Sequence, residues 1–286
     1  MSPQTGILVI GATGNVGRNV VAELVEQGTP VRALTRRPGR SGLPPGADVV
    51  QGDLTDPASL KAALDGIGAV FLVWPFLTAD DAPDVLGLIA EHARRVVYLS
   101  SSGVDDDAER QADPINRFHA DVERTIRASG VEWTFLRAGG FATNNLEWAQ
   151  TVRTERVVRA PFPNAARSLI HERDIAAVGV RALTEDGHVG AVHILTGPAS
   201  LTLVEQVDTI ASALDLPVRY EEVPPGQVRE QMLGAGWPAE VVDGILGHHD
   251  STQNTPDPVT TTVEDVTGAP ARTFRQWVLD HADDFR

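Results

Sequence analysis

The sequence contains no cysteine, and this absence limits the chemistry that the protein can perform. Without cysteine there are no disulfides, no catalytic thiolate, no iron–sulfur cluster and no thiolate zinc site. Redox chemistry must therefore come from a bound cofactor. The lack of cysteine also agrees with a reducing compartment.

Long apolar runs are absent as well. No run approaches the roughly 18 residues of a membrane-spanning helix, and the first predicted strand begins at Ile7, which leaves no room for a signal peptide. We therefore expect a cytoplasmic protein without a membrane partner.

Positive charge is scarce, because 24 Lys and Arg side chains stand against 39 Asp and Glu, a formal net charge of -15. Such a field repels nucleic acids, whose binding depends on neutralising phosphates. The densest basic cluster, Arg36, Arg37 and Arg40, has a better explanation below. We expect no nucleic-acid partner.

Three glycines, Gly11, Gly14 and Gly17, recur at every third position in one predicted turn near the N-terminus. The apolar run 7–10 predicts a buried parallel strand, and a helix is predicted after the turn. Gly11 permits the turn, Gly14 lets a phosphate approach bare backbone, and Gly17 lets helix and strand pack closely. The helix N–H groups and dipole would attract a pyrophosphate. The spacing predicts dinucleotide binding by Gly11, Thr13, Gly14, Asn15, Val16 and Gly17.

The second predicted strand, 30–35, ends in Arg36 and Arg37. In a doubly wound sheet this strand end faces the adenosine ribose, where an acid accepts from the 2′-hydroxyl and an arginine fits a 2′-phosphate. No acid occupies the position, so Arg36, with Arg37 as helper, predicts NADP(H) in preference to NAD(H). The alternative is two solvated loop arginines.

Strands and helices alternate along the chain. Further strands are predicted at 48–53, 69–73, 95–99 and 131–137, and this alternation predicts a parallel sheet with right-handed crossovers. We expect an α/β fold, a doubly wound parallel Rossmann sheet with a smaller mixed C-terminal substrate lobe. The Rossmann core would span 1–153, rejoined by 171–199, and the lobe would comprise 154–170 and 200–286. Within the lobe, residues 248–258 are predicted to be a polar linker.

Aromatic side chains follow the fourth strand at its carboxyl end. Val73, Trp74 and Pro75 are predicted to contact the cofactor, and Trp74 and Phe76 are candidate walls of a substrate pocket. The alternative for either aromatic residue is ordinary core packing.

The glycine turn, Thr35-Arg36, Gly52-Asp53-Leu54, the serine run up to Gly103 and the segment 136–144 occur in one order. This ensemble resembles the NmrA-like atypical short-chain dehydrogenases/reductases. The resemblance implies a Rossmann domain that binds NAD(P), mostly NADP(H). It also implies that Asp53 meets the adenine with Leu54 packed nearby, and that Phe141 and Asn144 lie in the loop beside the nicotinamide and acceptor. Without the resemblance, Asp53 would be interpreted as a capping or turn residue.

The chain departs from this family pattern at the helix after the fifth strand. Active superfamily members carry a tyrosine there and, four positions on, a lysine; here these positions hold Ile115 and His119, and Tyr98 and Tyr220 lie elsewhere. His119 is the candidate ribose ligand or general acid, with a solvated histidine as the alternative. Ser102 matches the serine that such proteins place beside the substrate oxygen, although serines after a strand are also ordinary turn residues.

Two functions follow as expectations. The first is an NADPH-dependent oxidoreductase that transfers hydride to a small conjugated or aromatic carbonyl acceptor such as a quinone. The second is a non-catalytic regulatory protein that senses NADP(H) and has a protein partner, an alternative that the missing tyrosine supports. No metal site is expected, because His171 with Asp174, and the run 248–250, are better explained as capping and solvated residues.

Overall fold

The computed structural model describes residues 6–286, and the chain divides into two compact units. The first comprises the residues up to Gln111, Ile115–Ala138 and Glu172–Ile194; the second comprises Ala112–Pro114, Gly139–His171 and Leu195–Arg286. This division differs from the boundaries expected from the sequence because residues 139–153 group with the second unit. No helix among residues 6–286 is long and apolar enough to cross a membrane.

The first unit is built on a seven-stranded sheet with the order β3-β2-β1-β4-β5-β6-β9. The six strands from β3 to β6 pair in parallel. Hydrogen bonds from Gly190 N to Trp133 O and from Gly139 N to Leu195 O show that β9 runs alongside β6 in the same direction. The strands are β1 (Gly6–Ile10), β2 (Val31–Thr35), β3 (Asp48–Gln51), β4 (Ile67–Val73), β5 (Arg95–Ser101), β6 (Glu132–Ala138) and β9 (Ala191–Leu195).

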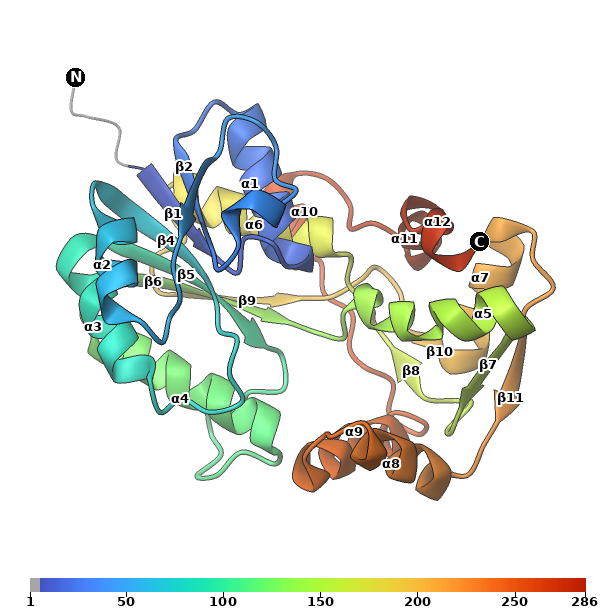
Figure 1. Ribbon diagram of the computed structural model, residues 1–286. Coiled ribbons are helices and arrows are strands. Elements are labelled where there is room, and N and C mark those ends of the chain that lie inside the picture. Colours follow the sequence, from blue (N-terminus) through green and yellow to red (C-terminus); the bar gives the residue numbers. More distant parts are fainter. Residues whose placement is uncertain (1–5) are drawn as a thin grey trace. The chain divides into compact units, whose positions relative to one another are not determined.

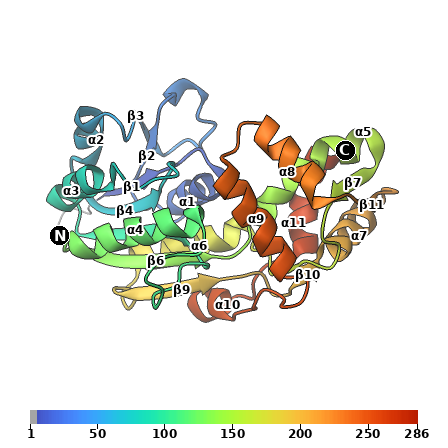
Figure 2. The ribbon, with the colours of Figure 1, turned by 90° about the horizontal axis from the view of Figure 1, so that it is seen from below.

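Helices cover both faces of this sheet (Figure 1, Figure 2). Val70 and Leu72 of β4 share a core with residues of α2, α3 and α4, whereas Phe71 between them faces Gly179 of α6 on the opposite side. Helix α1 packs against α6. The doubly wound α/β fold expected from the sequence is therefore confirmed. The helices are α1 (Asn15–Glu26), η1 (Pro38–Arg40), α2 (Pro57–Leu64), α3 (Ala82–His92), α4 (Pro114–Ala128) and α6 (Glu172–Thr184).

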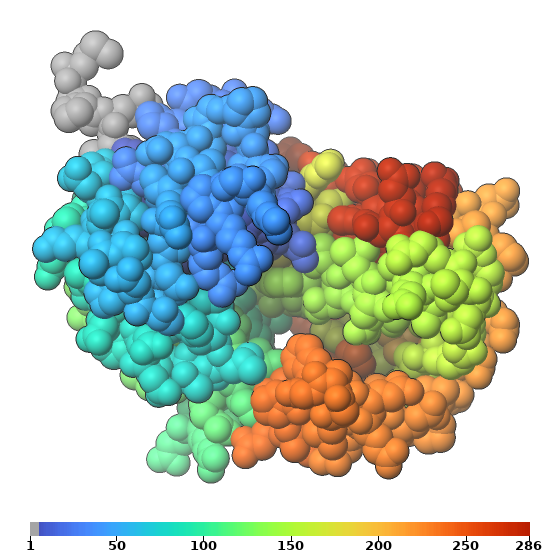
Figure 3. Space-filling model, in the orientation of Figure 1, coloured from blue at the N-terminus to red at the C-terminus, as the bar shows by residue number. Residues whose placement is uncertain are grey.

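The second unit has its own apolar core around the fully buried Trp277. Two small sheets pair β7 (Val157–Ala160) with β11 (Arg219–Glu222) and β8 (Ala166–Arg167) with β10 (Leu201–Thr202). The C-terminal helix α12 lies beside α5, as the red and light-green segments of Figure 3 show. The helices of the second unit are η2 (Ala142–Trp148), α5 (Ala149–Glu155), α7 (Leu203–Leu214), α8 (Pro225–Gly234), α9 (Ala239–Ser251), α10 (Thr262–Thr267), α11 (Phe274–Asp280) and α12 (Ala282–Phe285).

The predicted polar linker at 248–258 is wrong at its start, because α9 continues to Ser251. Polar residues on an exposed helix face look like a linker when only composition is considered. The end of α9 is held by the chain after it: Thr252 is buried, and its carbonyl accepts a hydrogen bond from Ala166 N at 3.2 Å. The helix end is therefore fixed by a distant strand.

Candidate functional site

The glycine turn between β1 and α1 has the geometry that the spacing predicts. Gly11 has a φ of +80°, and a Cβ there would lie 2.7 Å from Cβ of Val73. A Cβ on Gly17 would lie 2.2 Å from the carbonyl oxygen of Gly11. Both residues must therefore be glycine for the turn to pack against β4 and against itself.

Gly14 differs from the other two glycines. Its φ is -77°, and a Cβ there would meet only Gly11 O at 3.3 Å, so the fold itself does not demand glycine. Gly14 is exposed and precedes α1, whose first turn has neither a side-chain cap nor an acidic residue. An uncapped N-terminus with bare backbone is a fitting site for a phosphate group.

Arg18 is a residue that the sequence analysis missed. Its guanidinium donates to Thr13 O at 3.1 Å and is exposed beside the turn. A cation so close to a helix N-terminus opposes the helix dipole, and that mismatch is the signal in the sequence that could have identified it. Beside a bound anion the same charge would be favourable.

A second group of predicted residues meets at the ends of β2 and β3. Arg36 and Asp53 line one open pocket of about 440 Å³, together with Gln51, Gly52, Asp56 and Ser59. This volume lies within the usual range for small-ligand sites. Arg37 is exposed but is not among the residues that line this pocket.

Asp53 has the turn role that was one of its two interpretations, and its contact with the adenine stays a prediction. Its Oδ1 accepts hydrogen bonds from Thr55 N at 3.0 Å and Thr55 Oγ at 2.9 Å, which makes it a turn residue. These bonds, and the positive charge of Arg36, lower the pKa of Asp53, so the carboxylate is ionised. Two further residues of the pocket, which the sequence analysis did not predict, also shape this turn. The carboxylate of Asp56 caps α2, and the hydroxyl of Ser59 donates to Asp53 O.

The residues after β4 are mostly packed into the core. Trp74 is 6% exposed, and its indole N–H donates to Thr78 O at 2.7 Å. Phe76 contacts Trp74 edge to face and is only partly buried. Leu54 lies in the same core. Core packing therefore accounts for Trp74 without a ligand, and a pocket role for Trp74, Pro75 and Phe76 stays a prediction.

The predicted catalytic pair lies at β5 and α4. Ser102 is exposed just past the end of β5, and its backbone N–H donates to Ala138 O at 2.9 Å. His119 contacts β5 itself, because its Nδ1 lies 2.7 Å from the hydroxyl of Tyr98. Ile115, at the usual tyrosine position, packs partly buried against the core.

His119 is held neutral. Burial lowers its pKa to about 3. Burial also raises the pKa of Tyr98 well above 10, so the tyrosine keeps its proton. An imidazole with this pKa carries no charge at neutral pH and cannot serve as an imidazolium acid. Of the two roles considered for His119, hydrogen bonding to a ribose is the one compatible with this state.

A buried ionic network that the sequence analysis missed lies beside this pair. Glu123 of α4 is 0% exposed and accepts from Arg137 of β6 at 2.7 Å. Arg137 also binds Asp106 through two bonds of 2.7 Å, and Ser100 Oγ donates to Glu123 at 2.6 Å. An arginine inside an apolar strand was the available signal, since buried charges require partners.

Phe141 and Asn144 belong to the second unit. Phe141 precedes η2 and bridges to Ile170, and Asn144 is exposed. Their predicted contact with the acceptor stays a prediction. His171 is buried with Asp280 3.3 Å from its Nε2, and among residues 6–286 no three His, Asp or Glu side chains are grouped to hold a metal.

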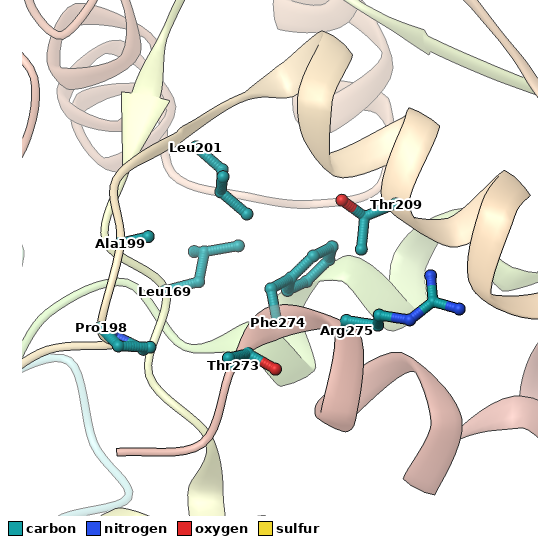
Figure 4. Close-up of a pocket in the computed structure, with 8 residues that line it drawn as sticks. All are labelled: Leu169, Pro198, Ala199, Leu201, Thr209, Thr273, Phe274 and Arg275. Carbon is teal, nitrogen blue, oxygen red and sulfur yellow. The ribbon is translucent and has the colours of Figure 1, made fainter. Parts of the chain in front are cut away.

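The second unit also contains a small apolar pocket of about 170 Å³, shown in Figure 4. Its volume is well below that of a typical cofactor or substrate site. It is lined by Leu169, Pro198, Ala199, Leu201, Thr209, Thr273, Phe274 and Arg275. None of these residues was predicted to belong to a site.

Known proteins share this arrangement. A family model described as NAD(P)H-binding matches residues 11–186, more than half of the chain. The (4-alkanoyl-5-oxo-2,5-dihydrofuran-3-yl)methyl phosphate reductase of Streptomyces griseus is 40% identical over 283 residues, covering 98% of this chain and 99% of that protein. The NAD(P)H azoreductase of Xenophilus azovorans is 35% identical over 288 residues, covering 98% and 99%.

Solved structures share the fold. The NADPH-dependent quinone oxidoreductase 2 of Escherichia coli, complexed with NADPH, has a TM-score of 0.78 at 22% identity, covering 96% of this chain and 99% of that one. The triphenylmethane reductase of a Citrobacter species has a TM-score of 0.79 at 17% identity, covering 97% and 99%. At these identities the likeness concerns the fold alone.

The family match begins at Gly11, the first residue of the turn, and includes Arg36, Asp53, Ser102 and His119. The resemblance to NmrA-like atypical short-chain dehydrogenases/reductases is confirmed, and the chain belongs to the NAD(P)H-binding family.

Proposed function

We propose that this protein is an NADPH-dependent oxidoreductase that transfers hydride to a small conjugated acceptor. The observation that carries the proposal is the uncapped N-terminus of α1 behind the bare backbone of Gly14. The bound dinucleotide supplies the hydride. The chain's own residues bind and orient it: the α1 turn takes the pyrophosphate, and the pocket at the ends of β2 and β3 takes the adenosine half.

The preference for NADP(H) over NAD(H) rests on Arg36. This arginine lines the pocket at the end of β2, where the 2′ position of the adenosine ribose lies in doubly wound folds. A guanidinium can form two charge-assisted hydrogen bonds to a phosphate. Asp53, which lines the same pocket, supplies the acceptor oxygen for the adenine amino group.

The acceptor class comes from the named activities of the relatives. One reduces a dihydrofuran that carries a ring carbonyl and an alkanoyl group, one reduces azo compounds, and a more distant one reduces quinones. All three acceptors are conjugated systems that take hydride at one end while a proton goes to the other. We therefore extend the expected acceptors from carbonyl compounds to include azo compounds.

The absence of the tyrosine is compatible with this chemistry. Hydride transfer needs only a nicotinamide held against the acceptor, and an aligned proton donor adds roughly 10²- to 10⁴-fold. Ser102, exposed at the end of β5, is the proposed hydrogen-bonding group on the acceptor oxygen. Phe141 and Asn144 are proposed to contact the flat face of the acceptor.

The sensor alternative receives no support from the comparisons, since the relatives reported above are named as enzymes. A small molecule is therefore the partner that we propose. A cytoplasmic location stays a prediction.

The test is NADPH oxidation in the presence of an alkanoyl dihydrofuranone phosphate, an azo dye and a quinone, followed through the absorbance of the reduced nicotinamide. We expect turnover with at least one acceptor and its loss in Gly14→Val, which blocks the phosphate. Gly87→Val is the matched control, because a Cβ on Gly87 meets nothing within 4 Å. Tight NADPH binding without turnover of any of the three acceptors would overturn the oxidoreductase proposal and favour a non-catalytic sensor of NADP(H).

A further inference from the structure

Tyr98 and His119 form a buried pair that the proposed function does not explain. The Tyr98 side chain is 0% exposed, lies edge to face on Phe135 and points its hydroxyl at Nδ1 of His119, 2.7 Å away. The His119 ring also lies against Phe118, with ring centroids 4.2 Å apart. Two aromatic neighbours, Tyr98 and Phe118, therefore fix where the imidazole lies and how it is turned, and Phe135 packs against Tyr98.

The hydrogen bond selects one tautomer of His119. A neutral imidazole has one N–H and one lone pair, and the tautomer is set by whatever its other nitrogen contacts. The tyrosine hydroxyl holds its proton, and among the described residues its hydrogen-bond partner is Nδ1 of His119, so the arrangement that uses this proton has the hydroxyl donating to Nδ1 and the imidazole hydrogen on Nε2. If Nδ1 carried the proton, the tyrosine could only accept, and its own hydrogen would lose this partner.

The Nε2 atom of His119 is the other polar atom of this imidazole. Among residues 6–286 no hydrogen bond reaches it, and it is not one of the fully buried unpartnered atoms. It is therefore accessible to solvent. Tyr98 is the fourth of the seven residues of β5, and Ser102, the proposed contact of the acceptor, follows the carboxyl end of the same strand, the edge at which ligands bind in doubly wound sheets.

We propose that Tyr98 is a positioning residue that fixes His119 as a neutral Nε2–H donor to an oxygen atom of the bound cofactor or acceptor. The inference rests on the proposed function for the identity of these ligands. The oxygen is a hydroxyl if it belongs to the cofactor ribose and a carbonyl if it belongs to the acceptor. No proton is transferred in either case: the imidazole remains neutral and contributes a directed hydrogen bond. Tyr98 acts only through His119.

The first test observes the tautomer directly. Nitrogen–proton correlation spectra of the imidazoles, with His119→Gln to assign the signal, distinguish Nε2–H from Nδ1–H. We expect Nε2–H in the wild type at neutral pH and a mixture in Tyr98→Phe. Tyr220→Phe is the matched control, because that hydroxyl donates to Ala160 O at 2.6 Å in the second unit. A wild-type His119 protonated on Nδ1, or on both nitrogens, would overturn the proposal.

The second test asks whether the donor is used. His119→Leu should lower affinity or efficiency on the order of ten-fold, the usual effect of one hydrogen bond, and Tyr98→Phe by less. His119→Gln, whose amide nitrogen can replace Nε2–H, should recover most of the loss. If the variant loses NADPH affinity in the absence of acceptor, the oxygen atom belongs to the cofactor. If only kcat/KM for the acceptor falls, the oxygen atom belongs to the acceptor. Wild-type behaviour of His119→Leu in both measurements contradicts the proposal.

These measurements separate the inference from the proposed function. If NADPH binds and no acceptor is reduced, the oxidoreductase proposal fails, whereas the tautomer and the NADPH affinities of the variants still decide the role of Tyr98. If turnover is found and His119→Leu is unaffected, the pair is only structural, and the oxidoreductase proposal stands.

Discussion

The turn before α1 and the contact between β5 and α4 are built in opposite ways. Apart from the contact of Gly11 with Val73 of β4, the groups that define the turn lie within residues 11–18, and most of them are backbone atoms. At the second place, Tyr98 meets His119 across 21 positions of sequence, and Glu123 meets Arg137 across 14. The first is specified by local spacing, and the second exists only when strands and helix have packed.

This difference determines which kind of substitution disrupts each of the two places. Backbone atoms cannot be removed by substitution, so the backbone part of the turn can be disrupted only by adding atoms to its glycines. A side-chain site in the interior is broken by removing one partner, which leaves the other buried and unpaired. Substitutions at the two places test this contrast.

Arg137→Met should cause the largest loss of stability, because it leaves the carboxylate of Glu123, 0% exposed, without its main partner. Breaking a buried ion pair in this way costs about 3 to 5 kcal/mol. Denaturant unfolding measures the change. The control is Arg124→Met, which removes an exposed ion pair with Asp121 and should change the free energy of unfolding by less than about 0.5 kcal/mol. If Arg137→Met and Arg124→Met lower the free energy of unfolding equally, the ion pair of Arg137 with Glu123 behaves like an exposed one.

Gly17→Ala and Gly14→Ala separate folding from binding within the turn. A Cβ on Gly17 would overlap Gly11 O at 2.2 Å, so we expect a destabilisation of about 1 to 3 kcal/mol. A Cβ on Gly14 meets only one atom, at 3.3 Å, so this variant should fold normally and lose NADPH affinity. Calorimetry and thermal unfolding check both. The idea is contradicted if Gly14→Ala binds NADPH like the wild type.

Arg36→Ala should weaken NADPH binding on the order of ten-fold and leave NADH binding unchanged, since only NADPH carries the 2′-phosphate. The control is Arg40→Ala, which removes an exposed arginine that does not line the pocket. Titration calorimetry with both dinucleotides measures the ratio. If Arg36→Ala keeps the wild-type ratio of NADPH to NADH affinity, Arg36 does not bind the 2′-phosphate.

The smallest effect is expected from pH at the half-exposed end of the ionic network. Hydrogen bonds from Arg137 lower the pKa of Asp106 below its ordinary value of 3.8. A lowered folded-state pKa contributes stability above about pH 4, and this is lost as pH falls through the folded value. Asp106→Asn should therefore be less stable than the wild type at neutral pH, and the gap should close at acidic pH. Asp107→Asn should follow the wild type, and a gap that persists at low pH would exclude this linkage.

Local sequence patterns are sufficient to predict the parallel sheet with its flanking helices, and they also give the candidate residues after β2 and β3. Apolar runs ending in glycine or arginine mark strands and their carboxyl edges, and in a doubly wound sheet these edges lie side by side. Arg36 and Asp53 follow two such strands, and in the structure they line one pocket. Helix α7 begins at the capping box of Thr202 and Glu205, a spacing that is visible in the sequence.

Only the tertiary structure decided the end of α9, the core packing of Trp74 and the state of His119. In the sequence, His119 is a titratable residue on a polar helix, and Tyr98 is an aromatic residue in a strand. Packing removes water from the imidazole, which holds it neutral, and brings the hydroxyl to one of its two nitrogens. Burial and contact across distant segments are properties of the folded chain, so no local pattern encodes which nitrogen of His119 carries the hydrogen.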